Sequence, residues 1–90
     1  MQTPTDAKYT TEIRDFIVNN FLFGEAGSLE NETSFMDSGT LDSTGVLELV
    51  TFLESTYAVK VQDKEMVPEN LDSINRAAAF VARKIAEKNK

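Results

Sequence analysis

Apolar residues recur at helical spacing in three stretches of this 90-residue chain. We expect helices over residues 6–20, 43–57 and 73–88, each with one apolar stripe formed by positions three and four residues apart. Residues 63–72 contain Pro68, which permits at most a short helical turn. The pattern therefore predicts an all-α fold: a small four-helix bundle of three main helices plus one short helical turn, with a long loop between the first two helices.

The stripe positions define the core that we expect. They are Tyr9, Ile13, Phe16 and Ile17 in the first helix, Val46, Leu49, Val50, Leu53 and Tyr57 in the second, and Ile74, Ala77, Ala78, Val81 and Ile85 in the third, with Phe80 at its edge. Phe52 lies off the stripe of its helix, so we expect it to pack against another element. Asp72 is the expected N-cap of the third helix.

The long connection, residues 21–42, needs contacts that hold it against the bundle, because loops of this length are uncommon in compact domains. Four apolar residues in it are expected to serve this purpose: Leu29, Phe35, Met36 and Leu41. Met66, Val67 and Leu71 can close one end of the core in the same way. We interpret residues 1–5 as a flexible tail and residues 6–88 as one domain.

The charge of the chain is acidic and unevenly distributed. Lys and Arg number 9 and Asp and Glu number 15, for a net charge of −6, and no basic residue occurs between Arg14 and Lys60. Such a surface disfavours nucleic acid and attracts proteins with basic patches, although acidity also simply promotes solubility. We find no signal peptide and no apolar run of the ~20 residues that a membrane-spanning helix requires. We expect a cytoplasmic monomer without membrane insertion.

The most informative residue is Ser43, at the junction between the long loop and the second helix. Asp42 and Ser43 are both N-cap residue types. A phosphate ester on a serine at this point would lie at the positive end of a helix. The chain has no His and no Cys, so it lacks the usual bases that activate a serine nucleophile and has no thiol of its own. Ser43 is therefore more plausible as the substrate of another enzyme than as a catalyst.

The segment Asp42-Ser43, followed by Leu47-Glu48-Leu49-Val50 and Phe52-Leu53-Glu54, resembles the acyl and peptidyl carrier proteins. The resemblance implies a non-catalytic carrier. A phosphopantetheinyl transferase would attach 4′-phosphopantetheine from coenzyme A to Ser43, and the thiol of that arm would hold an acyl or aminoacyl group as a thioester. Asp42 would help to hold Mg²⁺ during the transfer. Further partners would be an acyl- or aminoacyl-activating ligase and downstream acyl-processing enzymes.

A second, acidic arc of the helix follows on from Ser43 and is the expected partner-binding surface. It consists of Thr44, Leu47, Glu48, Thr51, Glu54 and Ser55, and the first five of these are the candidate partner contacts. The family usually has Leu or Ile where this chain has Thr44, which indicates a specialised pathway rather than bulk fatty-acid synthesis. Because Met1 begins the chain, we expect a free-standing carrier rather than a domain of a synthase.

Two other functions must be weighed. The chain could be an unmodified acidic helical adaptor that binds a basic partner through the same helix face. It could also be a small Ca²⁺ sensor, because Asp37 and Glu48 occupy positions 1 and 12 of an EF-hand register. That register fails, since Gly39, Leu41 and Asp42 stand where two oxygen ligands and a glycine are needed. We therefore predict no metal site.

Overall fold

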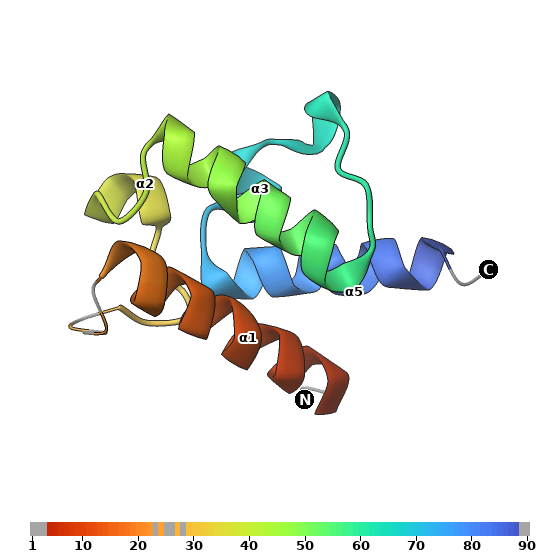
Figure 1. Ribbon diagram of the computed structural model, residues 1–90, viewed down its shortest axis with the longest axis horizontal. Helices are drawn as coiled ribbons and strands as arrows, with labels where there is room; N and C mark the ends of the chain where they lie inside the picture. Colours follow the sequence, from red (N-terminus) through yellow and green to blue (C-terminus); the bar gives the residue numbers. More distant parts are fainter. Residues whose placement is uncertain (1–3, 23, 25–26, 28, 89–90) are drawn as a thin grey trace.

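The computed structural model describes residues 4–22, 24, 27 and 29–88, and all of the regular structure in these residues is helical. Three long helices form the frame: α1 (Pro4–Phe21), α3 (Ser43–Tyr57) and α5 (Ile74–Lys88) (Figure 1). Two one-turn helices, α2 (Phe35–Ser38) and α4 (Pro68–Leu71), and a 3₁₀ turn, η1 (Asp63–Glu65), lie between them. The predicted all-α bundle is confirmed, and the long connection before α3 contains one helical turn.

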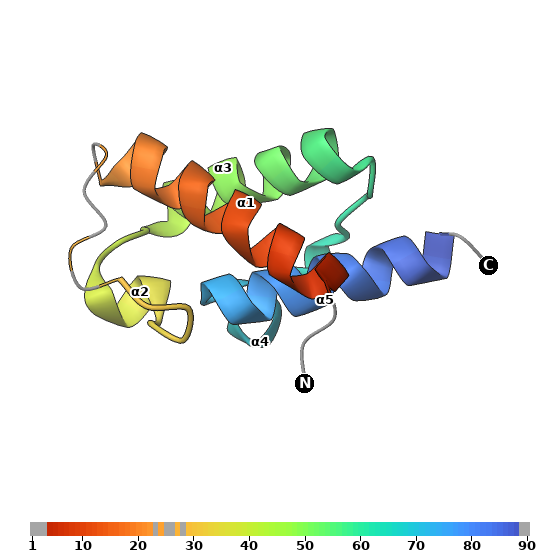
Figure 2. The same ribbon diagram turned by 90° about the horizontal axis from the view of Figure 1, so that it is seen from below.

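The long helices surround a single apolar core, with α1 packed against α5 and α3 lying alongside α1 and across part of α5. Both views place α2 and α4 near the end of the bundle where α5 begins (Figures 1 and 2). The most deeply buried large side chains come from every part of the chain and are Ile13, Ile17, Phe35, Leu49, Leu53, Leu71, Ile74, Phe80 and Val81. The connecting segments therefore supply core residues and are fixed by them.

Three details differ from the sequence-based expectations. Met36 is 47% exposed instead of holding the loop against the core, whereas the other three apolar residues of the loop are buried. Phe80 is fully buried at 1% exposure rather than at the edge of the stripe. Helix α1 begins at Pro4, two residues before the expected start. Proline suits the first turn of a helix, because the N–H that it lacks would have no intrahelical partner there. Residues 1–3 of the expected tail lie outside the described residues.

The expected capping of α5 by Asp72 is wrong. Ser73 caps α5 instead, since its Oγ accepts a hydrogen bond from the N–H of Arg76 at 3.0 Å. The two residues are both good N-cap types, and the chain places the second one at the helix boundary. Asp72 is thereby left available for contacts with the long loop.

Aromatic side chains join α1 to α3. Phe52 finds its partner in Phe16, with ring centroids 4.3 Å apart and planes 16° from parallel. Tyr57 packs edge-on against Tyr9 and donates a hydrogen bond of 2.7 Å to Oε1 of Glu12. Burial, reinforced by the Glu12 carboxylate, raises the pKa of Tyr57, so its hydroxyl stays protonated and remains a donor.

A surface ion pair fixes η1 to α5. Glu65 Oε1 accepts a hydrogen bond from the N–H of Gln62, and Lys84 Nζ lies 2.9 and 3.1 Å from the two carboxylate oxygens. The Gln62 N–H first, and then the Lys84 ammonium, hold the pKa of Glu65 below its ordinary value. The next residue, Met66, begins the link to α4, so this contact anchors one side of that link.

We predict that Glu65→Gln reduces the acid sensitivity of folding. Because the pKa of Glu65 is lower in the folded chain than in the unfolded chain, protonation favours unfolding. The stabilisation is present above the ordinary Glu pKa of about 4.3 and is lost as the pH falls through the folded value. Urea unfolding between pH 3 and 6 should show a shallower loss of stability in the variant. Glu69→Gln, which removes an exposed carboxylate of α4, is the control and should follow the unmodified chain.

Candidate functional site

Ser43 is the first residue of α3, and Asp42 before it is the N-cap. Asp42 has an extended backbone, and its Oδ1 accepts a hydrogen bond of 2.8 Å from the N–H of Gly45. The cap is therefore supplied by Asp42 and not by Ser43. The side chain of Ser43 is exposed, and its hydroxyl makes no hydrogen bond to any described residue. The result is a free hydroxyl at the positive end of a 15-residue helix.

Gly45 allows the first turn of α3 to pack closely on its neighbours. It is buried, and a Cβ at this position would lie 3.1 Å from Cδ2 of Leu41 and 3.3 Å from Cε1 of Phe21. A larger residue would have to displace Leu41 or Phe21. Leu41 itself is buried two residues before Ser43. Leu41 before Ser43 and Gly45 after it are thus both packed into the core, and they fix the end of the helix that carries Ser43.

Asp72 holds α2 against the junction between α4 and α5. Its carboxylate accepts hydrogen bonds from the hydroxyl of Ser34 and, at 2.9 Å, from the N–H of Met36, while its carbonyl accepts from the N–H of Phe35 at 3.0 Å. Ser34 Oγ in turn accepts from the N–H of Asp37 and so caps α2. One aspartate therefore fixes the position of a helical turn that lies 36 residues away in sequence.

The remainder of the long loop is tied to α1 and α5. Arg14 donates through Nη1 to the carbonyl of Leu29 at 3.1 Å and through Nη2 to Oδ1 of Asn31 at 2.5 Å. The carbonyl of Asn31 accepts from the N–H of Asn75 in α5 at 2.9 Å. These bonds explain how a long connection remains part of a compact domain.

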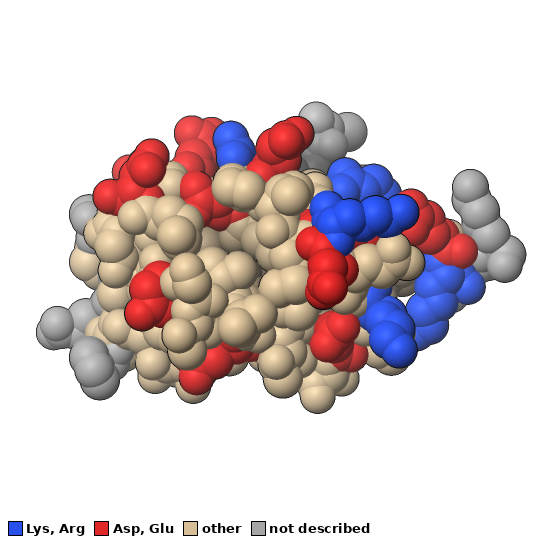
Figure 3. Space-filling model, turned by 90° about the horizontal axis from the view of Figure 1, so that it is seen from above, with Lys and Arg blue, Asp and Glu red and all other residues tan. Residues whose placement is uncertain are grey.

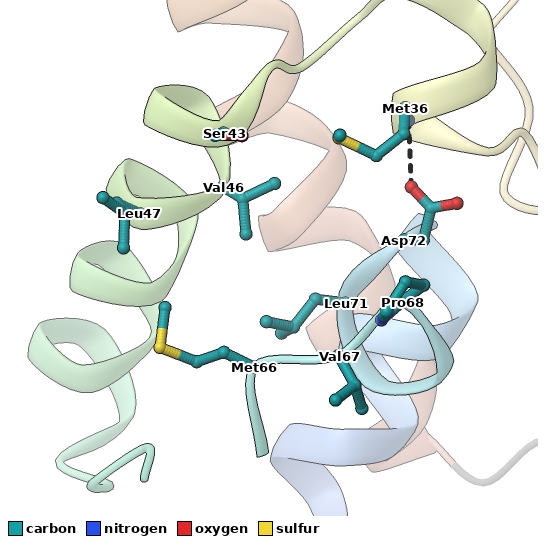
Figure 4. Close-up of a pocket in the computed structure, with 9 residues that line it drawn as sticks. All are labelled: Met36, Ser43, Val46, Leu47, Met66, Val67, Pro68, Leu71 and Asp72. Carbon is teal, nitrogen blue, oxygen red and sulfur yellow. Dashed lines mark hydrogen bonds between the residues drawn. The ribbon is translucent and has the colours of Figure 1, made fainter. Parts of the chain in front are cut away.

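A mostly apolar cavity of about 340 Å³ opens next to Ser43, between α3 and α4 (Figure 4). We call it the α3–α4 cavity, and it is lined by Met36, Ser43, Val46, Leu47, Met66, Val67, Pro68, Leu71 and Asp72. In the close-up, Met36 extends from α2 towards α3, and Leu71 and Met66 extend towards the same space from the other side. The exposed position of Met36 is thus explained, because its side chain forms part of the wall.

The sequence identified the α3 side of this cavity and missed the rest. Ser43 and Leu47 were candidate site residues, whereas the cavity residues of α2, α4 and the link before α4 were expected only as packing. The sequence feature that could have indicated the role of Asp72 is the pair Asp72-Ser73. Both are cap-type residues, and only Ser73 caps α5. Nothing local indicates that the other residue of the pair reaches Met36.

The expected partner-binding residues divide into an exposed group and one engaged residue. Thr44, Leu47, Glu48 and Thr51 are exposed, and Leu47, at 55%, is among the most exposed large apolar side chains described. Glu54 is half-buried, and its Oε2 accepts a hydrogen bond of 2.9 Å from the N–H of Val61. The Glu54 carboxylate thus holds the segment that follows α3. The Glu48 carboxylate makes no such contact among the described residues.

Charge is segregated along the molecule. Figure 3 shows most of the visible Lys and Arg gathered at the end where α5 finishes, whereas Asp and Glu are spread over the rest of that face. Lys60, Lys84 and Lys88 line one hollow at this end. The surface around the start of α3 therefore has an acidic character.

Comparison with known proteins adds relatives of one kind. The chain is 27% identical over 73 residues to a probable acyl carrier protein, PigG, of Serratia sp. (strain ATCC 39006), with 81% of this chain and 84% of that protein aligned. It is 26% identical over 70 residues to the acyl carrier protein of Brachyspira hyodysenteriae (strain ATCC 49526 / WA1), with 78% and 87% aligned. The chain is thus similar to acyl carrier proteins over most of its length. No family model matches the sequence.

The chain also resembles one from a crystal structure described as that of an FAD-dependent dehydrogenase. The two are 30% identical, with a TM-score of 0.68, and the match covers 77% of this chain and 97% of the other. Since the aligned 77% of this chain covers 97% of the other one, the matched chain is the shorter of the two. Among the described residues, no helix is long and apolar enough to cross a membrane.

We predict that Asp72→Ala loosens α2 without unfolding the long helices. The substitution removes the acceptor of the Ser34 hydroxyl and of the exposed Met36 N–H, and a hydrogen bond that water can replace contributes about 0.5–1.5 kcal/mol to stability. Urea unfolding should show that loss, and hydrogen exchange should be faster at Met36 and Asp37 than in α1 or α5.

The control for this test is Glu69→Ala, which removes an exposed carboxylate three residues away. It should change neither the unfolding midpoint nor the exchange at Met36 appreciably. Unchanged exchange at Met36 in Asp72→Ala would contradict the role that we assign to Asp72.

Proposed function

We propose that this protein carries acyl or aminoacyl groups as thioesters on a 4′-phosphopantetheine arm attached to Ser43 and presents them to partner enzymes in the cytoplasm. The observation that carries the proposal is the free, exposed hydroxyl of Ser43 at the start of α3, next to the α3–α4 cavity. Asp42 supplies the helix cap, so modification of Ser43 leaves the cap intact. The carrier itself has no catalytic role.

The residues around Ser43 fit a phosphodiester. The unpaired N–H groups at the start of α3 and the helix dipole favour negative charge on the Ser43 oxygen. During attachment, a bond forms between Ser43 Oγ and the phosphorus that bears the pantetheine, and the diphosphate bond of coenzyme A breaks. The hydroxyl proton leaves to a base of the transferase, because this chain has no His and no Cys. Asp42 Oδ1 accepts the Gly45 N–H, so the other carboxylate oxygen of Asp42 would be available to help hold Mg²⁺, which would offset the negative charge of the phosphates.

The α3–α4 cavity gives the arm and its cargo an apolar surface. Val46 and Leu47 supply one side, and Met66 and Leu71 supply the other. Methionine adapts its shape more easily than branched residues do, so Met36 and Met66 suit cargo of more than one shape. Burial of apolar cargo here contributes about 25 cal/mol for each Å² removed from water. The cavity thereby shields part of the cargo between encounters with enzymes.

Partner enzymes are proposed to bind the exposed side of α3. Leu47 supplies an apolar contact, Thr44 and Thr51 supply polar ones, and Glu48 attracts basic surfaces. Glu54 contributes less directly, because its carboxylate already accepts the Val61 N–H. The partners are the phosphopantetheinyl transferase, an acyl- or aminoacyl-activating ligase and downstream acyl-processing enzymes.

One downstream enzyme class has a specific observation in its favour. The matched chain from the dehydrogenase structure is shorter than this 90-residue chain, so it is only one small domain. We infer that this domain accompanies the dehydrogenase in that structure and is not the dehydrogenase itself. We therefore include an FAD-dependent dehydrogenase acting on the tethered group among the proposed partners. The relatives named as acyl carrier proteins favour the carrier over an unmodified adaptor that would use the same face.

Modification of Ser43 is the central prediction. Incubation of the chain with coenzyme A, Mg²⁺ and a broad-specificity phosphopantetheinyl transferase should raise its intact mass by one phosphopantetheine. Ser43→Ala should abolish the gain, whereas Ser55→Ala, which removes an exposed serine from the same helix, should leave it unchanged. Absence of any gain in the unmodified sequence would favour the adaptor.

Glu48→Lys should weaken recognition by the transferase. Reversal of an exposed charge that faces a basic partner surface lowers association, so we expect KM for the carrier to rise roughly three- to tenfold with kcat little changed. The effect should shrink at high salt because exposed charges are screened. Glu30→Lys makes the same charge change at an exposed site in the long loop and should leave KM within about twofold.

A further inference from the structure

A second apolar hollow lies between α1 and α3, outside the α3–α4 cavity. It has a volume of about 490 Å³, and an adjoining hollow of about 340 Å³ continues it along α1. The two share Phe16, Asn20, Phe52 and Thr56, so we treat them as one feature, the α1–α3 groove. Among the described residues, Leu47 alone lines both this groove and the α3–α4 cavity. The two depressions therefore flank α3 on different sides.

The floor of the groove is aromatic and reachable by solvent. Phe16 and Phe52 are stacked and only half-buried, and Phe21 meets Phe16 edge-on at a centroid distance of 5.8 Å. Stacking between these rings holds α1 to α3 but leaves part of their faces open. A small domain gains nothing in stability from aromatic surface left in water, so this floor is available to an apolar side chain from outside.

The charged residues that line the groove are all acidic. Glu48 lies on the α3 side, and Glu12 and Asp15 lie on the α1 side. No Lys or Arg is among the described residues that line either hollow. Asp15 and Glu48 are exposed and have no ion-pair partner among the described residues, whereas Glu12 accepts the Tyr57 hydroxyl. An occupant with positive charge beside an apolar side chain matches both the floor and the rim.

We propose that the α1–α3 groove docks a basic amphipathic helix of a partner protein. An aromatic or aliphatic side chain of that helix inserts over Phe16 and Phe52, and its Lys or Arg residues face Asp15 and Glu48. A second copy of this chain fits less well, because each copy has a net charge of −6.

Docking in the groove leaves the α3–α4 cavity open. Thr44 lines the groove, and Ser43, the preceding residue, lines the cavity. A partner bound in the groove therefore holds the chain close to Ser43 without covering the space next to its hydroxyl. The groove includes Thr44, Leu47, Glu48 and Thr51, so this proposal rests on the partner-binding side of α3 proposed above. It does not depend on modification of Ser43, so it is tested on the unmodified chain, and its failure would leave the mass assay unaffected.

The test uses isotope-labelled protein and three synthetic helical peptides of about 14 residues. The first carries Phe and Leu on one face with flanking Lys residues, the second replaces Lys by Glu, and the third keeps Lys but replaces Phe and Leu by Ala. We expect only the first peptide to shift the resonances of Phe16, Thr51 and Phe52. Asp15→Asn with Glu48→Gln should weaken this binding roughly fivefold, and Glu30→Gln with Glu69→Gln should not change it.

A filling variant provides an independent test. Ser55→Trp places a large side chain in the groove from an exposed position and should abolish the shifts, whereas Ala79→Trp on the exposed side of α5 should not. Equal binding of the first and third peptides, or shifts confined to the α3–α4 cavity, would overturn the proposal. So would movement of the same resonances on simple concentration of the protein, which would identify a second copy as the occupant.

Discussion

The hydrogen bonds of Asp72 are the constraint on which the site depends. A helix of one turn such as α2 has almost no stability of its own, so its position is set by what it touches. Burial of Phe35 and the Asp72 carboxylate supply that contact from the far end of the chain. The α3–α4 cavity exists because α2, α3 and α4 are held at fixed positions around it. Its shape is therefore a property of tertiary structure and not of α3 alone.

The junction at the start of α3 separates two tasks that one residue could have combined. Asp42 satisfies the helix end, and Ser43 remains free for chemistry. Gly45 brings the same turn close to Leu41 and Phe21, which limits motion of the helix end. A hydroxyl on a well-anchored helix end has a defined position, which is what the proposed carrier role would require.

Sequence periodicity predicted the long helices, most of the core and the location of Ser43, because these depend on neighbours within one or two turns. It could not predict the partner of Phe52, since nothing near that residue indicates that it stacks on Phe16. Asp72 was assigned to the nearest helix end, whereas its side chain contacts Ser34, 38 residues away. The same limitation hid the α4 side of the cavity. Local rules describe capping well but do not determine which of two adjacent cap-type residues is used.

The gathering of Lys60, Lys84 and Lys88 at one end gives the molecule an electric dipole moment along its length. In the field of a basic protein surface, such a dipole would exert a torque that turns the acidic end, and with it Ser43, towards that surface before contact. Fewer encounters then begin in the wrong orientation. For the partner binding proposed above, neutralising those lysines is expected to slow association, although none of them is among the described residues that line the cavity next to Ser43.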